Sequence, residues 1–112
     1  MLAMLKKGHK IDESNEGGYT ALHLAAMYGY SSMVELAVKN GASLDVKTKA
    51  GLTPLLTALY HGHDAIAVWL INNGADINLP AQNGATPLDF ATIYECPNAR
   101  KLLESKHAKT MN

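Results

Sequence analysis

The chain has 112 residues, with ten basic and ten acidic side chains, and therefore a formal net charge of zero. This length suits one domain, and the lack of a basic excess argues against a nucleic-acid partner, because phosphate contacts dominate such binding. Hydrophobic residues make up 47% of the chain and charged residues 18%, which excludes a disordered composition and allows a buried core.

Cysteine usage and hydropathy bear on the compartment. Cys96 is the single cysteine, so no internal disulfide can form. Small secreted domains usually depend on disulfides, and we therefore expect a reducing, cytoplasmic environment. The longest uninterrupted apolar run, Ala65 to Ile71, is far shorter than the roughly 20 residues of a membrane span. We expect no membrane association.

A single period of 33 residues runs along the chain. Glycine, threonine and leucine recur at this step in three copies. The recurring positions are Gly8, Gly41 and Gly74; Gly18, Gly51 and Gly84; Thr20, Thr53 and Thr86; and Leu22, Leu55 and Leu88. Self-similarity at one fixed period indicates a repeat architecture.

The first full copy predicts two short helices. Thr20 is a favourable N-cap for an Ala-rich helix over Ala21 to Tyr28. Gly29 breaks the chain, and a second helix is expected over Ser32 to Asn40. Gly41 then closes this helix, because glycine readily adopts the left-handed conformation that ends helices.

The second copy follows the same plan. Pro54 follows Thr53 and fits the first helical position, where its missing N–H costs nothing. Gly62 breaks the chain, and a second helix is expected over Asp64 to Asn73 before Gly74.

The third copy changes character in its second helix, which begins at Pro97. Arg100 and Glu104 are four residues apart and hence share one helical face. The earlier copies carry apolar residues in these columns, namely Val34 and Val38, then Ala67 and Ile71. A charged face offers nothing for a further copy to stack on, which is typical of a terminal capping repeat.

Helix pairs this short cannot bury their apolar faces alone and must stack on their neighbours. The Thr-Pro-Leu segments, Ala21-Leu-His-Leu-Ala-Ala26 and Gly74-Ala-Asp-Ile-Asn78 resemble the ankyrin repeat. The resemblance implies an all-α solenoid of stacked helix-turn-helix units joined by β-turn loops. We expect a partial N-terminal repeat at 1–14, repeats at 15–47 and 48–80, a capping repeat at 81–107 and a disordered tail at 108–112.

The N-terminal end has two open interpretations. Met1 to Lys7 aligns with Val34 to Asn40, the second helix of a repeat whose first helix is absent. Either the natural protein is longer, or this helix is an abbreviated cap. We expect a monomer, although the apolar N-terminal edge offers a surface for self-association.

Candidate chemical sites are few. His61-Gly-His63-Asp64 holds possible zinc ligands, but no third or fourth ligand is evident nearby. Cys96 lacks a recognisable base and orienting group, and buried cysteine commonly acts as a small apolar residue. We therefore expect no catalysis, no metal, no cofactor and no small-molecule substrate.

The resemblance also assigns roles to single residues. His23 matches the family histidine that bonds neighbouring loops, whereas Leu56 and Asp89 replace it in the later copies, so those junctions should be held differently. Asn78 matches an asparagine that can be hydroxylated in eukaryotic ankyrin repeats. Trp69 is expected to pack between second helices, with a partly exposed anchor on the convex side as the alternative.

Ankyrin domains usually bind protein partners through a concave surface built from turn tips and first helices. Tyr28, Tyr60 and Tyr94 end successive first helices and are expected to form a ladder there. The candidate partner-binding residues are Glu16, Tyr19, Met27, Tyr28, Lys49, Leu52, Tyr60, His61, Gln82, Asn83, Ile93 and Tyr94. Gly17, Ala50 and Ala85 complete the turn tips.

The leading functional hypothesis is a non-catalytic adaptor, scaffold or inhibitor that recognises another protein. The alternative is a regulatory or targeting fragment of a larger ankyrin-containing enzyme, channel or secreted bacterial effector. A third hypothesis, a small-molecule or metal binder, stays open to titration.

Overall fold

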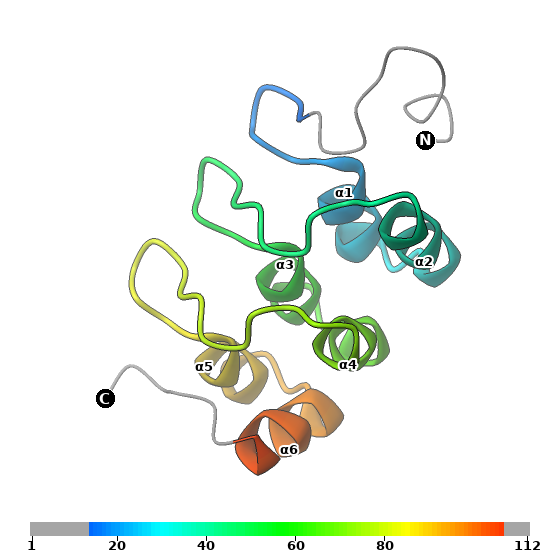
Figure 1. The fold of residues 1–112 in the computed structure, drawn as a ribbon. Helices are drawn as coiled ribbons and strands as arrows, with labels where there is room; N and C mark the ends of the chain where they lie inside the picture. The colour runs from blue at the N-terminus through cyan, green and yellow to red at the C-terminus, as the bar shows by residue number, and fades with distance from the viewer. Residues whose placement is uncertain (1–13, 107–112) are drawn as a thin grey trace.

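The computed structural model describes residues 14–106, which contain six helices and no strand. The helices form three pairs: α1 (Ala21–Tyr28) with α2 (Ser31–Lys39), α3 (Pro54–Tyr60) with α4 (Asp64–Asn72), and α5 (Pro87–Ile93) with α6 (Pro97–Ser105). The pairs stack on one another, with α1, α3 and α5 in one layer and α2, α4 and α6 in a second (Figure 1). The expected partial repeat at Met1 to Lys7, its self-association edge and the tail at 108–112 lie outside the described residues.

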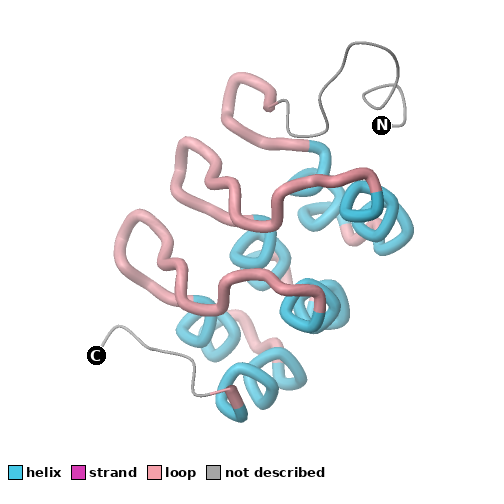
Figure 2. Tube along the Cα trace, in the orientation of Figure 1, coloured by secondary structure: helices cyan, strands magenta, loops and turns pink. Residues whose placement is uncertain are grey.

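Each pair is linked to the next by an extended loop, and the loops project from the same side of the stack, beside the layer of α1, α3 and α5 (Figure 2). The structure thus has the all-α stacked architecture that the period predicts. The pairs are called the first, second and third repeat below.

The first helices begin where the sequence predicts. Thr20, Thr53 and Thr86 are N-caps with extended backbones, and each hydroxyl accepts a hydrogen bond from the backbone N–H three residues on. Pro54 and Pro87 occupy the first turn of α3 and α5, where the missing N–H leaves no carbonyl unpaired.

Glycine ends the helices in the first two repeats. Gly29 and Gly62 have φ angles of 77° and 75° and turn the chain between the two helices of a pair. Glu95 stands in the same column of the third repeat and adopts a φ of 56°, a left-handed conformation that costs a non-glycine residue energy. The second helices α2 and α4 each end one residue before the predicted position.

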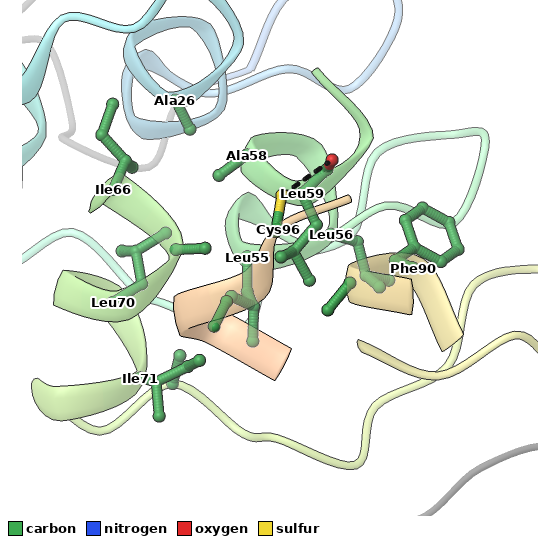
Figure 3. Packing of buried hydrophobic residues seen from close by; sticks show 14 of the residues in the cluster. Ala26, Leu55, Leu56, Ala58, Leu59, Ile66, Leu70, Ile71, Phe90 and Cys96 are labelled. Atoms are coloured by element: carbon green, nitrogen blue, oxygen red, sulfur yellow. Dashed lines mark hydrogen bonds between the residues drawn. The ribbon is translucent and has the colours of Figure 1, made fainter. Parts of the chain in front are cut away.

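Apolar side chains from all three repeats form a continuous core. Leu22, Leu55 and Leu88, one repeat apart, are buried, as are Leu70 and Leu103 of the second layer. Figure 3 shows Leu70 beside Ile66 and Ile71, with Leu55 and Leu56 on the neighbouring helix. Small residues keep the first layer close: Ala25, Ala58 and Ala91 share one column and are buried.

The last helix carries the expected charged face. The Arg100 Nε lies 3.6 Å from Glu104 Oε2, and both side chains are half exposed. In the earlier repeats the corresponding Val34, Ala67 and Ile71 are buried. Arg100 and Glu104 are therefore charged and partly exposed where the earlier repeats bury apolar side chains, and the capping role of the third repeat stays a prediction.

The second and third repeats are joined by a capping interaction that the sequence analysis missed. Asp64, the first residue of α4, accepts hydrogen bonds at Oδ1 from the Ala99 N–H (2.8 Å) and at Oδ2 from the Asn98 N–H (3.1 Å). These orphan donors belong to the first turn of α6, whose own N-cap residue Cys96 makes no side-chain cap. Asp64 therefore caps the α6 helix of the next repeat.

The equivalent position of the first repeat is Ser31, and its side chain forms no hydrogen bond in the described part of the chain. A crevice of about 190 Å³ lies between α2 of the first repeat and α4 of the second. Its lining residues include Ser31, Ala65, Ile66 and Trp69. Trp69 is half-buried and packs against the core, and its alternative role as an anchor on the convex side stays a prediction.

The core predicts a large loss for one truncation. Leu70 is fully buried, so Leu70→Ala should lower the free energy of unfolding by about 2–5 kcal/mol through lost transfer energy and a residual cavity. Chemical denaturation followed by circular dichroism measures this change. A midpoint close to that of the wild type would contradict the burial of Leu70 between repeats.

The cap predicts a smaller loss at Asp64. Asp64→Ala should lower the free energy of unfolding by about 1–2 kcal/mol, because two backbone donors at the start of α6 lose their acceptor. Ser31→Ala is the matched control, since Ser31 holds the same column and caps nothing in residues 14–106. Equal effects of the two substitutions in urea denaturation would show that the interaction with α6 contributes nothing.

Candidate functional site

A groove lies where the loops meet α3 and α5. Its volume is about 430 Å³. It is open to solvent and runs between the loop that precedes α3 and the loop that precedes α5. Its lining residues are Ala50, Leu52, Tyr60, Ala81, Gln82, Asn83, Phe90 and Tyr94.

Three aromatic rings form one side of this groove. The Tyr60 and Tyr94 ring centroids are 5.0 Å apart, with an interplanar angle of 79°, and Tyr94 also meets Phe90 edge-on at 5.5 Å. Phe90 is buried, whereas Tyr60 is 48% and Tyr94 36% exposed. Edge-to-face pairs of this kind are stabilising, and they hold both tyrosines over the buried Phe90. The groove therefore presents a pre-ordered aromatic surface.

The two loops that flank the groove are held by their own hydrogen bonds. The Thr48 N–H donates to the Leu52 carbonyl at 2.8 Å, and the Ala81 N–H donates to the Ala85 carbonyl at the same distance. Asn83 Oδ1 accepts from the Ala85 N–H at 3.0 Å. These bonds fix the loop tips without help from a ligand.

Neighbouring turns also pack tightly against each other. Gly51 has a φ of 83°, and a Cβ there would lie 2.8 Å from the Gln82 backbone nitrogen. Only glycine permits both this conformation and this approach. The distance between the two loops, and so one wall of the groove, depends on Gly51.

The structure brings together five of the twelve predicted binding residues: Leu52, Tyr60, Gln82, Asn83 and Tyr94. The other seven do not line this groove: Glu16, Tyr19, Met27, Tyr28, Lys49, His61 and Ile93. Phe90 and Ala81 are lining residues that the sequence analysis did not propose. Phe90 could have been found from its place one helical turn before Tyr94.

The expected ladder of three tyrosines holds for only two of them. Tyr60 meets Tyr94, whereas the Tyr28 ring lies 6.1 Å from that of Tyr30. The steps from Tyr28 to Tyr60 and from Tyr60 to Tyr94 are 32 and 34 residues, so Tyr60 lies one column away from the other two. One residue along a helix rotates a side chain by about 100°, so Tyr60 is rotated away from the common column of Tyr28 and Tyr94, and it meets the tyrosine of the following repeat, Tyr94.

The remaining candidates occupy varied surroundings. Tyr19 lies edge-on to His23 at 5.9 Å and is half-buried, and Met27 is also half-buried. Glu16, Lys49 and His61 are exposed, and Ile93 is exposed despite its apolar side chain. Asn78 is exposed in the loop after α4, and its hydroxylation stays a prediction.

His23 joins the first two repeats as expected. Its Nδ1 accepts from the Thr20 N–H at 3.1 Å, which leaves the proton on Nε2 to donate to the Leu52 carbonyl at 2.9 Å. Leu52 lines the groove, so this bond anchors one of its walls. Burial lowers the pKa of His23 below its usual value, against the opposing effect of the backbone acceptors Leu52 and Val46.

Leu56 and Asp89 hold the column of His23 in the second and third repeats, and they make different contacts, as expected. Leu56 is buried in the core and forms no capping box. Asp89 reproduces the capping box through Oδ2, which accepts from the Thr86 N–H at 2.9 Å. The histidine is therefore dispensable for the local cap.

His63 and Cys96 share a column and a structural role that the sequence analysis did not anticipate. His63 Nε2 bonds the Met27 carbonyl at 3.0 Å, and Cys96 Sγ lies 3.7 Å from the Leu59 carbonyl. Each side chain thus reaches back to the end of the first helix of the preceding repeat. The sequence signal for this shared role was the spacing of 33 residues between His63 and Cys96.

The surroundings of Cys96 and His61 shift the pKa values of both side chains. Burial raises the pKa of the Cys96 thiol, assisted by the Asp64 carboxylate, which disfavours the thiolate. Burial and the neighbouring His63 lower the pKa of His61. Among residues 14–106, no three His, Cys, Asp or Glu side chains are grouped so as to hold a metal ion.

Comparison with models of known families identifies the family to which this architecture belongs. The family model described as ankyrin repeats (3 copies) matches residues 1–81 and 45–112. The chain belongs to the ankyrin-repeat family, whose repeats are generally protein–protein interaction modules and typically lack catalytic activity. No curated protein matches the chain significantly. Within the described part of the chain, no helix has the length and hydropathy needed to cross a membrane.

The His23 geometry predicts a pH dependence of stability. The folded state disfavours protonation of His23, so the unfolded state binds more protons below its ordinary pKa of about 6.5. The free energy of unfolding should be fully retained above that pH and should fall as the pH drops from about 6.5 toward 5. In urea denaturation across this range, His23→Gln should show a flatter pH profile than the wild type. An unchanged profile would assign the dependence to other groups.

Proposed function

We propose that the chain is a non-catalytic adaptor, scaffold or inhibitor that binds a protein partner in the groove between the second and third repeats. The observation that carries this proposal is the exposure of Tyr60 and Tyr94 on the wall of a preformed groove. Neither tyrosine is needed to fill the core, which Phe90 and the leucines already occupy.

The residue types support this assignment. Tyrosine is enriched among binding hot spots, because it provides a large contact area and loses little rotamer entropy on binding. A volume of about 430 Å³ is within the range of sites that accept ligands or anchor side chains. The family membership supports the coarser statement, a protein-interaction module, and the exposed tyrosines of the groove support the proposed place of contact.

The wider surface extends along the loops and the first layer of helices. Its proposed contributors are Lys49, His61 and Ile93, which adjoin groove-lining residues in sequence, and Glu16, Tyr19, Met27 and Tyr28, which lie on the turn and first helix of the first repeat. A cytoplasmic location and a monomeric state are part of the proposal.

A photo-crosslinkable residue in place of Asn83 tests the location, because Asn83 is exposed at the groove. The same residue in place of Glu35, exposed on α2, is the control for the outer layer. A partner captured from position 83 and not from position 35 agrees with the proposal. Capture from position 35 alone would place binding on the convex side.

Binding energy and stability should separate at the two tyrosines. Tyr60→Ala combined with Tyr94→Ala should weaken binding of the captured partner by about 2–4 kcal/mol, the scale of hot-spot residues. The same pair should cost less stability than Leu70→Ala, because both rings are partly exposed in the free protein. Calorimetry and urea denaturation measure the two quantities on one sample.

Tyr30→Ala is the matched control, since Tyr30 is a similarly exposed tyrosine outside the groove. It should leave both affinity and stability nearly unchanged. Unchanged binding in the double variant, together with a collapse in stability, would show that the two tyrosines serve the core.

A further inference from the structure

The groove has a basic side that its lining residues alone do not reveal. Lys47 and Lys49 are exposed in the loop that continues into Ala50 and Leu52. Neither lysine forms an ion pair within the described part of the chain. Two unneutralised ammonium groups therefore lie on the loop that forms one wall of the groove.

No carboxylate lines the groove to balance them. The opposite loop, residues 81–85, reads Ala-Gln-Asn-Gly-Ala and is uncharged. Asp89 of α5 is engaged at the Thr86 N–H and hydroxyl. Glu95 follows Tyr94 but lines a different hollow, together with Arg100, at the end of the stack.

Glu16 is the carboxylate of the neighbouring turn. It belongs to the turn of the first repeat, on the side of the Lys49 turn away from the groove, where the Lys49 N–H donates to the Gly17 carbonyl at 3.0 Å. Glu16 and Lys49 are not ion-paired in residues 14–106. Asp45 and Asp76 stand earlier in the two loops, where their carboxylates accept hydrogen bonds from the Asp76 and Asn78 N–H groups. Lys47 and Lys49 are the charged residues nearest in sequence to the groove-lining Ala50 and Leu52.

The uncharged wall provides hydrogen-bonding groups suited to a peptide backbone. The Gln82 carboxamide is exposed and makes no hydrogen bond within the described residues. Asn83 uses its Oδ1 for the Ala85 N–H, which leaves its amide nitrogen to donate. A backbone offers alternating donors and acceptors, so these two amides favour an extended segment over a purely apolar ligand.

The aromatic side of the groove, the two side-chain amides on the opposite loop and the two nearby lysines together favour one kind of occupant. We infer that the groove takes an acidic segment of a partner protein, with one aliphatic or aromatic anchor side chain against Tyr60 and Tyr94 and flanking Asp or Glu residues facing Lys47 and Lys49. This inference rests on the proposed function and specifies its partner. A cationic ligand fits less well, because the aromatic faces that attract it lie beside two like charges.

The test begins with selection. A displayed library of short random peptides is selected on the whole chain at low ionic strength and again near physiological salt. The selected sequences should share one large apolar residue with Asp or Glu close to it. Enrichment of basic or uncharged sequences, or no enrichment, overturns the inference.

Synthetic peptides then separate the two contributions by fluorescence anisotropy. Replacing the acidic residues of a selected peptide by Asn and Gln should weaken binding by about tenfold, and the remaining affinity should depend less on salt. Replacing the apolar anchor by Ala should weaken binding by at least about tenfold. An acidic peptide whose affinity survives the first replacement overturns the inference.

Charge reversal on the protein provides the matched control. Lys47→Glu and Lys49→Glu should each weaken the acidic peptide by about fivefold or more, whereas Lys101→Glu, exposed on α6, should have no effect. Equal effects at all three positions would show net charge alone and overturn the inference.

The two proposals fail in different ways. If selected peptides depend on Tyr60 and Tyr94 but not on Lys47 and Lys49, the groove stands as the binding site and its acidic preference is wrong. If Tyr60→Ala with Tyr94→Ala leaves peptide affinity unchanged, the proposed function itself is contradicted at this groove.

Discussion

The structure depends on one constraint, which is that none of its helices can bury an apolar face alone. Each of the six helices in residues 14–106 has only seven to nine residues, too few to be stable in isolation. Burial therefore comes from contacts between repeats, where Leu22, Leu55 and Leu70 meet side chains of neighbouring pairs. The recurring alanines allow this approach, and stability is shared between units and the interfaces that join them.

Specific hydrogen bonds reinforce this stacking, and they differ from one interface to the next. His23 and His63 join the first repeat to the second through the carbonyls of Leu52 and Met27. Asp64 and Cys96 join the second repeat to the third. Different side chains make these bonds at the two interfaces. In each case they provide hydrogen-bond partners for backbone groups at the ends of short helices and loops of the adjacent repeat. A repeat protein can thus vary its joints without changing its architecture.

Because the core and the joints account for stability, the loop-side surface is free to carry other chemistry. Tyr60 and Tyr94 are held in place by Phe90, and the flanking loops are fixed by internal hydrogen bonds and by the close approach at Gly51. A rigid surface loses little entropy when a partner binds, which favours affinity at a small contact area. The same scaffold that needs uniform stacking therefore presents a groove whose polarity depends on a few residues of the loops and first helices.

The sequence by itself determined the period, the helix starts at Thr20, Thr53 and Thr86 and the charged last face at Arg100 and Glu104. These signals are local, because caps, breakers and helical periodicity act within a few residues. The tertiary structure alone decided that Tyr60 meets Tyr94 rather than Tyr28, that Asp64 caps α6, and that Phe90 completes the groove. Those contacts join residues some 30 or more positions apart in most cases. They depend on the offset and rotation between stacked repeats, and a shift of one residue, which hardly changes the repeat pattern, turns a side chain by about 100° to another neighbour.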